Sequence, residues 1–229
     1  MHTGYLINNT RVTPVIYKIT AELREEFSFL PGQFVMIESE HTEKKIARAF
    51  SIASDSAHPQ RITWYMQWHP ESIVTERIHK LPLQSAIHFG EARGLMTVPT
   101  ESHQRIVYIA TSTGVAPFLS HLYYLADFRP SQAVTLYFGV RTEADIFALE
   151  EIAEFQKKLP NLIVKITLSQ PSEGYTGLRG RVTEHLKNNS FEKDTLYYLC
   201  GNKQMIIDAR NILTQNNVPP THIKFEIFF

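Results

Sequence analysis

The chain has 229 residues, 43% of them hydrophobic, so it is long enough to bury a substantial core as one large domain or two small ones. Lysine and arginine total 23 against 23 aspartate and glutamate, and this formal charge of zero argues against a nucleic-acid partner. The single cysteine excludes an internal disulfide and any four-thiolate iron–sulfur cluster or zinc site held within this chain.

Export and membrane spanning are not expected. The first residues show no basic start followed by an apolar stretch, and no run reaches about 18 apolar residues. Low cysteine content fits a cytoplasmic protein. The ten histidines do not pair with a second histidine or cysteine at the spacing of helical metal ligands, so no metal site is predicted.

Residues 1 to about 98 predict an antiparallel β-structure, a small barrel or sandwich. Short extended runs at 12–22, 34–38, 50–53 and 61–68 are separated by turn residues. The segment Leu30-Pro31-Gly32-Gln33 supplies one such turn, directly before the run at 34–38. A single helix is predicted in this half, at 72–79.

From residue 104 onward the pattern changes to apolar strand, turn and helix, which is typical of βαβ units. Strands are predicted at 106–110, 133–138, 162–168 and 195–199, and helices at 116–126, 148–158, 182–187 and 203–216. This alternation predicts a doubly wound parallel sheet. The polar segment 99–104 begins with Pro99 and is the expected linker, which gives two domains, 1–99 and 104–229.

A turn at 111–114 joins a predicted strand to a predicted helix. Backbone N–H groups at such a helix start point beyond the strand's carboxyl end, where open parallel sheets bind ligands and where phosphate is stabilised. Taken alone, Gly114 fits equally well a tight turn that needs glycine for steric reasons. Pro117 suits the first turn of the helix, where a missing N–H costs little.

Two further segments offer candidate chemistry. Cys200 and Gly201 follow a predicted strand at the same sheet edge, although a lone cysteine at a strand end is more typical of a buried apolar residue. Arg48 and Ser51 place a charge and a hydroxyl around Phe50, which suits a phosphate and an aromatic ring, but a surface arginine over a barrel edge has the same pattern. The segments that contain Arg48, Gly114 and Cys200, in this chain order, together predict one cleft in which hydride passes between two cofactors.

Seven segments carry a family resemblance: Pro31-Gly32-Gln33-Phe34, Arg48-Ala49-Phe50-Ser51, Gly90-Glu91-Ala92-Arg93-Gly94, Thr113-Gly114-Val115-Ala116-Pro117, Phe138-Gly139-Val140-Arg141, Cys200-Gly201 with Met205, and Phe225-Glu226-Ile227-Phe228. With these segments the chain resembles, over nearly its whole length, the ferredoxin-NADP reductase family. These flavoprotein oxidoreductases are built from an FAD-binding β-barrel and a nicotinamide-binding α/β domain.

The resemblance implies that Arg48 binds a flavin phosphate, Phe50 packs on the flavin and Ser51 hydrogen-bonds near its reactive nitrogen. Hydride would pass from NAD(P)H to FAD beside Cys200, with Glu226 and the final aromatic residues closing the flavin's other face. Ser51, Cys200 and Glu226 are thus the implied catalytic residues. The implied cofactor-binding residues are Arg48, Ala49, Phe50, Ser51, Thr75 (for the pyrophosphate), Thr113, Gly114, Pro117, Arg141, Gly201, Met205, Phe228 and Phe229.

Three positions depart from the family pattern. Phe50 replaces a tyrosine, as in the flavin reductase branch. Glu71 places a carboxylate before the first helix, where the family often has paired glycines near the pyrophosphate. Ser112 replaces the first glycine of the nucleotide turn and limits close backbone approach.

The coenzyme preference stays open at this point. Members of the family that select NADPH tend to have a Ser-Arg pair where this chain has Ser169-Gln170. Arg179 or Arg181, one loop later, would be able to substitute, because arginine binds phosphate with a bidentate fork.

The leading hypothesis is an FAD-dependent NAD(P)H oxidoreductase that passes electrons to a small one-electron carrier, a ferredoxin or flavodoxin. The rival is an NAD(P)H:flavin reductase that uses free flavin as a substrate. A third hypothesis, from a different class, is a non-catalytic docking module of the same fold. The resemblance is compatible with a monomer.

Overall fold

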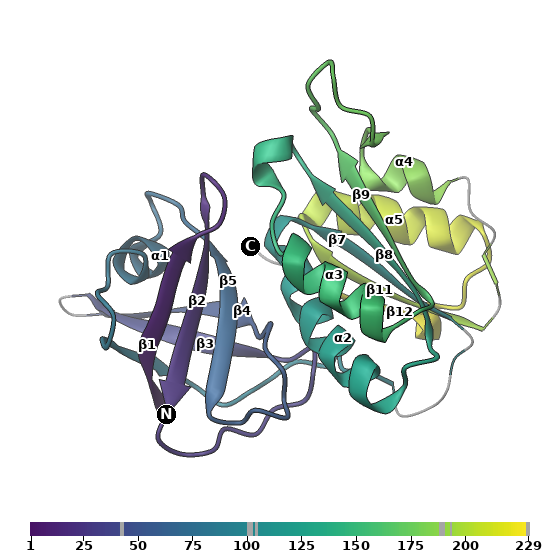
Figure 1. Cartoon of the computed structure of the whole chain (residues 1–229). Helices are drawn as coiled ribbons and strands as arrows, with labels where there is room; N and C mark the ends of the chain where they lie inside the picture. Colours follow the sequence, from purple (N-terminus) through teal and green to yellow (C-terminus); the bar gives the residue numbers. More distant parts are fainter. Residues whose placement is uncertain (42–43, 100–102, 104, 188–190, 193, 228–229) are drawn as a thin grey trace. The chain divides into compact units, whose positions relative to one another are not determined.

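The computed structural model describes residues 1–229 apart from 42–43, 100–102, 104, 188–190, 193 and 228–229. The chain divides into two compact units (Figure 1), Met1–Val98 with Ala116–Tyr124 and Pro99–Val115 with Leu125–Phe229. Most of the expected linker, 99–104, lies outside the described residues. The domain limits 1–99 and 104–229 stay a prediction.

A six-stranded antiparallel sheet forms the first unit, in the order β4-β3-β6-β1-β2-β5. Just beyond β4, the Ala53 N–H donates to the Thr63 carbonyl of β5 over 2.8 Å, which joins the two outer strands and confirms the predicted antiparallel barrel. The elements are β1 (His2–Arg11), β2 (Ile16–Leu23), β3 (Phe34–His41), β4 (Lys44–Ser51), β5 (Arg61–Gln67), α1 (Ile73–Ile78) and β6 (Ala86–Phe89).

The predicted strand 12–22 is wrong at its start. β2 begins at Ile16, because Thr13 and Pro14 form a turn in which the Ile16 N–H donates to Thr13 Oγ1 over 3.0 Å. Proline has no N–H for a strand ladder, which explains the late start. The sequence pattern also missed β1, whose polar residues leave only Gly4 and Leu6 buried, and the short β6.

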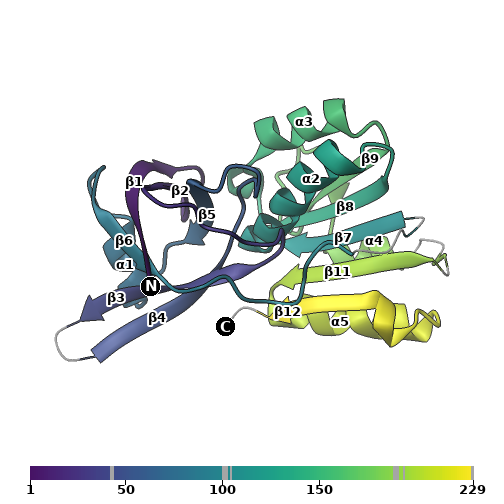
Figure 2. The ribbon, with the colours of Figure 1, turned by 90° about the horizontal axis from the view of Figure 1, so that it is seen from below.

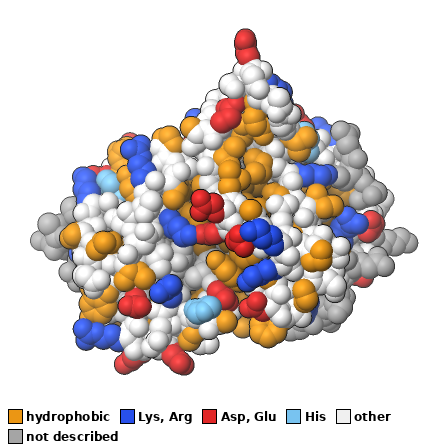
Figure 3. Space-filling view, in the orientation of Figure 1, with side chains coloured by type: hydrophobic (Ala, Val, Ile, Leu, Met, Phe, Trp, Pro, Cys, Tyr) orange, Lys and Arg blue, Asp and Glu red, His pale blue; other side chains and the backbone are white. Residues whose placement is uncertain are grey.

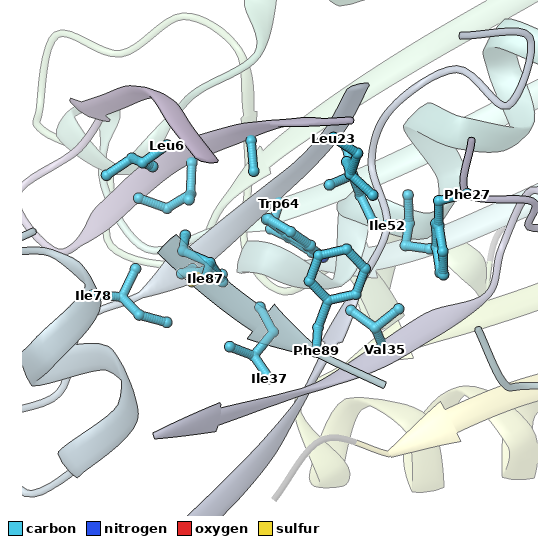
Figure 4. Packing of buried hydrophobic residues seen from close by; sticks show 14 of the residues in the cluster. Leu6, Leu23, Phe27, Val35, Ile37, Ile52, Trp64, Ile78, Ile87 and Phe89 are labelled. Atoms are coloured by element: carbon cyan, nitrogen blue, oxygen red, sulfur yellow. The ribbon is translucent and has the colours of Figure 1, made fainter. Parts of the chain in front are cut away.

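Aromatic rings form the centre of the first unit's core (Figure 4). Phe89 packs edge-on against Trp64, with ring centroids 5.5 Å apart, and against Phe27, at 5.2 Å. Edge-to-face pairs of this kind add to the free energy gained by burying the rings. Leu6, Leu23, Val35, Ile37, Ile52, Ile78 and Ile87 pack around them.

In the second unit, six strands run parallel in the order β10-β9-β8-β7-β11-β12. Helix α3 lies on one face of this sheet and α5 on the other (Figure 2), which confirms the doubly wound prediction. The elements are β7 (Arg105–Thr111), β8 (Ala133–Val140), α3 (Leu149–Lys158), β9 (Leu162–Leu168), β10 (Leu178–Arg179), α4 (Val182–Leu186), β11 (Thr195–Gly201), α5 (Lys203–Gln215) and β12 (Ile223–Ile227).

The predicted strand 162–168 coincides with β9, while β7, β8 and β11 run slightly beyond their predicted ends. Two strands were not predicted. β10 has only two residues, too few for a pattern, and the alternating residues Ile223–Ile227 of β12 were not recognised as a strand. No helix in the described part of the chain is both long and apolar enough to cross a membrane.

Helix α2 (Ala116–Phe128) contributes a buried histidine to the first unit. His121 is fully buried, and its Nε2 donates to the Met96 carbonyl over 2.8 Å. A Cβ on Gly32, where φ is +96°, would lie 2.3 Å from this nitrogen, so only glycine fits the turn beneath the ring. Burial lowers the pKa of His121 from 6.5 to about 4, against the opposing effect of hydrogen bonds to Met96 and Pro31.

The buried imidazole predicts a loss of stability in mild acid. Between pH 6.5 and about 4 the unfolded chain binds a proton at His121 that the folded chain does not, so the free energy of unfolding falls as the pH falls, by about 1.4 kcal/mol per pH unit. Above pH 6.5 the residue contributes no slope. Urea unfolding from pH 4.5 to 7.5 should give His121→Gln a shallower acid slope than the wild type, whereas His69→Gln, at an exposed histidine, keeps the wild-type slope. Equal slopes for all three proteins would contradict the assignment.

Candidate functional site

The turn after β7 packs directly on the end of β11. Residues Ser112–Val115 form a short 3-10 helix, η1, that leads into α2. A Cβ atom on Gly114 would lie 2.2 Å from the Cys200 carbonyl oxygen and 2.7 Å from Gly201 Cα. Glycine is therefore required here by close backbone approach, and the structure brings together the two turns that the sequence placed at one sheet edge.

A second glycine, on β11, makes the contact between β11 and the turn after β7 equally close. Gly201 has φ +136°, and a Cβ there would lie 2.2 Å from Thr111 Oγ1. That hydroxyl accepts a hydrogen bond from the Asn202 N–H over 2.9 Å. Ser112, with φ +51°, occupies the left-handed region that favours glycine, at the position where the family has one. The backbone at this position therefore has a conformation that favours glycine, although the residue is a serine.

Helix α5 begins at this edge with a side-chain cap. The side-chain oxygen Oδ1 of Asn202 accepts hydrogen bonds from the N–H groups of Gln204, at 2.9 Å, and Met205, at 3.4 Å. Met205 was expected near a cofactor, but its side chain is buried in the second unit's core cluster. Its contribution visible in the structure is to packing.

Cys200 lies opposite Glu226 in the parallel pairing of β11 with β12. The cysteine is fully buried, and burial, with a smaller effect from Glu226, raises the pKa of the thiol well above its usual value. This environment favours the neutral thiol at physiological pH over the thiolate, the form that acts as a nucleophile. It offers a small, weakly polar surface.

On the flavin-side candidate strand, β4, alternate residues point to opposite faces. Arg48 and Phe50 share one face, and Ala49 and Ser51 the other. Arg48 is exposed, and Phe50 is half-buried against the core of the first unit. Ser51 is 6% exposed, and its hydroxyl makes no hydrogen bond to any residue that the structure describes. A buried hydroxyl in this state favours a polar ligand atom beside it.

The start of α1 satisfies its own polar groups. The Thr75 hydroxyl, expected at a pyrophosphate, is buried and accepts from the His69 N–H over 3.3 Å, while the Thr75 N–H donates to Ser72 Oγ over 3.4 Å. Hydrogen bonds from Lys80 and then Trp68 lower the pKa of Glu76 in the first turn, so this carboxylate is ionised. Exposed Glu71 adds a second carboxylate in the preceding loop. These features oppose an anion at this six-residue helix.

A further carboxylate at the second unit's edge was missed by the sequence analysis. Glu143, in the 3-10 helix η2 (Glu143–Asp145) after β8, accepts hydrogen bonds at Oε1 from the Ser172 N–H, over 3.0 Å, and from Ser172 Oγ, over 2.6 Å. The hydrogen bond from the Ser172 hydroxyl is the main cause that lowers the pKa of Glu143. The sequence signal that would have identified Glu143 is an acidic residue shortly after the second strand of a predicted nucleotide-binding sheet.

The remaining candidates are scattered. Arg141 is exposed after β8, Pro117 is buried in the first turn of α2, and Phe228 and Phe229 lie outside the described residues. That the β4 residues and the β7–β11 edge line one cleft stays a prediction. Within the described residues, no group of three or more histidine, cysteine, aspartate or glutamate side chains is placed to hold a metal ion. Acidic and basic side chains are interspersed on the face shown in Figure 3.

The Gly114 contact predicts a strong steric penalty. Gly114→Ala places a methyl group against the backbone of Cys200, which has no side-chain freedom to yield, so we expect a loss of about 2 kcal/mol or more in the free energy of unfolding. Gly174→Ala is the matched control, since nothing lies within 4 Å of its Cβ position, and it should change stability by less than about 0.5 kcal/mol. Equal denaturant midpoints for the two variants would refute the close approach.

The buried thiol predicts protection from alkylation and disulfide exchange. At pH 8 the folded chain should react with Ellman's reagent far more slowly than the same chain in guanidinium chloride, where its single cysteine reacts fully. Release of one equivalent of thionitrobenzoate within seconds from the folded protein would show an accessible thiolate and would overturn the assignment.

Comparison with known proteins relates part of the chain to a known domain family. Residues 108–211 match the model of the oxidoreductase NAD-binding domain. The chain is 29% identical over 225 residues to the reductase component of propane 2-monooxygenase from Gordonia sp. strain TY-5, covering 95% of this chain and 64% of that protein. It therefore spans less than two thirds of that relative.

Two other comparisons cover both chains almost completely. Ferredoxin–NADP reductase B of Sorangium cellulosum is 26% identical over 227 residues, 94% of this chain and 92% of that protein. The crystal structure of a ferredoxin NADP+ reductase from Neisseria gonorrhoeae, with bound FAD and NADP, has a TM-score of 0.87 and 20% identity, covering 99% of this chain and 98% of that one. The chain is thus similar to ferredoxin-NADP reductase-like oxidoreductases in sequence and in fold, and residues 108–211 match the oxidoreductase NAD-binding domain.

Proposed function

We propose that the chain is an FAD-dependent NAD(P)H oxidoreductase that passes electrons from a nicotinamide cofactor, through flavin, to a one-electron carrier such as a ferredoxin or flavodoxin. The names of its relatives support this function, since one is the reductase component of a monooxygenase and another a ferredoxin–NADP reductase. These 229 residues hold one cysteine, so they cannot themselves hold an iron–sulfur centre bound by four cysteines.

The observation that carries the proposal is the buried Ser51 hydroxyl without a hydrogen-bond partner among the described residues. Leaving such a group unpaired costs about 1–3 kcal/mol, and a polar atom of a bound flavin ring would remove that cost. Arg48, exposed on the same strand, supplies a cation for the flavin phosphate. Phe50, on the same face of β4 as Arg48, presents an aromatic surface.

On the nucleotide side, the Gly114 turn brings backbone N–H groups to the carboxyl edge of a parallel sheet, the position where such sheets bind dinucleotides. When both cofactors are bound, the nicotinamide supplies a hydride and the flavin divides the two electrons into single transfers. Cys200, neutral and buried, would border the nicotinamide site, and Glu226 beside it on β12 would exclude or orient water.

A second candidate function is an NAD(P)H:flavin reductase that releases its flavin after each turnover. The start of α1 favours it, because the polar groups there bond one another and two carboxylates stand where a pyrophosphate would need cations. The flavin mononucleotide portion fits the residues of β4, while the α1 region does not fit the second phosphate. The electron carrier, a cytoplasmic location and a monomeric state are parts of the proposal.

The deciding measurement is the visible spectrum of the desalted protein before and after anaerobic addition of NADH or NADPH. Retained flavin that bleaches supports the electron-carrier function. Loss of flavin on desalting, with catalytic reduction of added FAD or FMN, supports the flavin reductase. If neither coenzyme reduces any flavin, both enzyme functions fail and a docking module of the same fold remains.

Substitution of Ser51 should move two quantities in opposite directions. Ser51→Ala removes an unpaired buried hydroxyl, so the flavin-free protein keeps or gains thermal stability, while flavin affinity falls roughly tenfold. Ser85→Ala is the control, because the Ser85 hydroxyl already donates to the Pro82 carbonyl over 2.7 Å, and its loss should leave flavin affinity unchanged. Unchanged flavin affinity in Ser51→Ala, measured by fluorescence quenching, would remove Ser51 from the site.

A further inference from the structure

We propose that Glu143 selects NADH against NADPH, by accepting a hydrogen bond from the adenosine 2′-hydroxyl and repelling a 2′-phosphate at the same position. The inference rests on the proposed function, since it concerns which nicotinamide coenzyme that site takes. Four residues carry the argument and are called the selector group: Glu143 after β8, Gln170 and Ser172 after β9, and Arg179 on β10.

The position of the group follows from the sheet. β8 lies beside β7, with Thr111 paired to Gly139. The carboxyl end of β8 is therefore the neighbour of the Gly114 turn at this edge of the sheet. A dinucleotide whose pyrophosphate lies on the first turn extends its adenosine over the end of the second strand, where an acidic side chain binds the ribose hydroxyls and an arginine would instead accommodate a 2′-phosphate. Glu143 follows Val140, the last residue of β8, after only two intervening residues.

Ser172 holds the Glu143 carboxylate in place. Its N–H and its hydroxyl both donate to Oε1, at 3.0 and 2.6 Å, which joins the loop after β8 to the loop after β9. These bonds keep the group ionised, since they lower its pKa. A carboxylate accepts about four hydrogen bonds, so capacity remains for a ribose hydroxyl. A phosphate dianion has no hydrogen to donate and would meet a fixed negative charge.

Arg179 is near enough for its charge to help lower the pKa of Glu143, but its Nη2 hydrogens are already used by the loop after β9. Arg179 Nη2 donates to the carbonyl oxygens of Ser172, Glu173 and Tyr175 at 2.8, 2.7 and 2.8 Å. This guanidinium therefore clamps the loop that presents Ser172 to Glu143. A phosphate recruiting the same nitrogen would have to break these bonds.

The neighbouring side chains add little for a phosphate. Gln170 is neutral, and its N–H donates to the Arg141 carbonyl over 2.7 Å, which fixes the two loops side by side. Arg141 and Arg181 are exposed cations, but Glu143 follows the first closely and Glu184 lies one helical turn beyond the second. Each positive charge thus has a carboxylate near it in the chain.

Binding of two adenosine nucleotides, ADP and 2′,5′-ADP, tests the proposal without turnover. By isothermal titration calorimetry, the wild type should bind ADP at least tenfold more tightly than 2′,5′-ADP. Glu143→Gln keeps the side-chain shape and removes the charge, so the preference should fall about tenfold. The ratio of kcat/KM for NADH over NADPH should fall in parallel.

Glu173→Gln is the matched control, because it removes one exposed carboxylate from the same loop, next to Ser172, and should leave the preference within about twofold of the wild type. Tighter binding of 2′,5′-ADP by the wild type, or equal effects of the two substitutions, would overturn the role of Glu143. If ADP is preferred and Glu143→Gln relaxes the preference while no flavin is reduced, the selector group stands and the proposed oxidoreductase function fails. Flavin reduction with equal use of NADH and NADPH would support the oxidoreductase function and overturn the selector group.

Discussion

The edge on which the nucleotide site is built depends on two backbones in contact. Gly114 lies against the Cys200 carbonyl, and Gly201 against the Thr111 hydroxyl, so no side chain separates the turn after β7 from the end of β11. This contact fixes the distance between the end of β7 and the end of β11, at the sheet edge where α2 and α5 begin. The capped start of α5 and the position of Cys200 follow from it.

Burial and hydrogen bonding divide the ionisable groups of the molecule into distinct roles. The Cys200 thiol and the His121 imidazole are fully buried and neutral at physiological pH, so the thiol contributes to packing and the imidazole to packing and to a hydrogen bond with the Met96 carbonyl. Glu76 and Glu143 lie nearer the surface, and side-chain donors keep them charged. The charged carboxylates of Glu76 and Glu143 therefore influence which anions bind near them. The buried side chains of Cys200 and His121 instead support the surrounding backbone.

Much of the architecture follows from patterns visible in the sequence. The strand–turn–helix alternation of the second half predicts its parallel sheet, because strands buried on both faces are continuous apolar runs. β1 and β12 were missed because each is an irregular or short segment that contributes only a few side chains to the core, Leu6 from β1 and Ile223 and Ile227 from β12. Pro14 was included in a strand because its neighbours are apolar.

Individual residues of the candidate site were harder to place than the segments that contain them. The sequence identifies Gly114 and Cys200 as neighbours at one edge, yet only the fold shows that glycine is needed for backbone contact and that the thiol is neutral. Met205 and Thr75 belong to recognisable motifs, but burial and local hydrogen bonds occupy their side chains. Glu143 depends on a hydrogen bond to Ser172, 29 residues away, which no local pattern contains.

The path of α2 limits how this protein can be cut or recombined. The helix continues directly from the nucleotide turn, but its first residues, Ala116–Tyr124, group with the barrel, and His121 bonds the carbonyl of Met96. A fragment made by cutting near residue 100 would leave the barrel without this helix and give the other piece a helix with exposed apolar side chains. Chimeras between relatives should therefore exchange α2 together with the barrel residues that it packs on. Deletion libraries should show that neither fragment folds on its own.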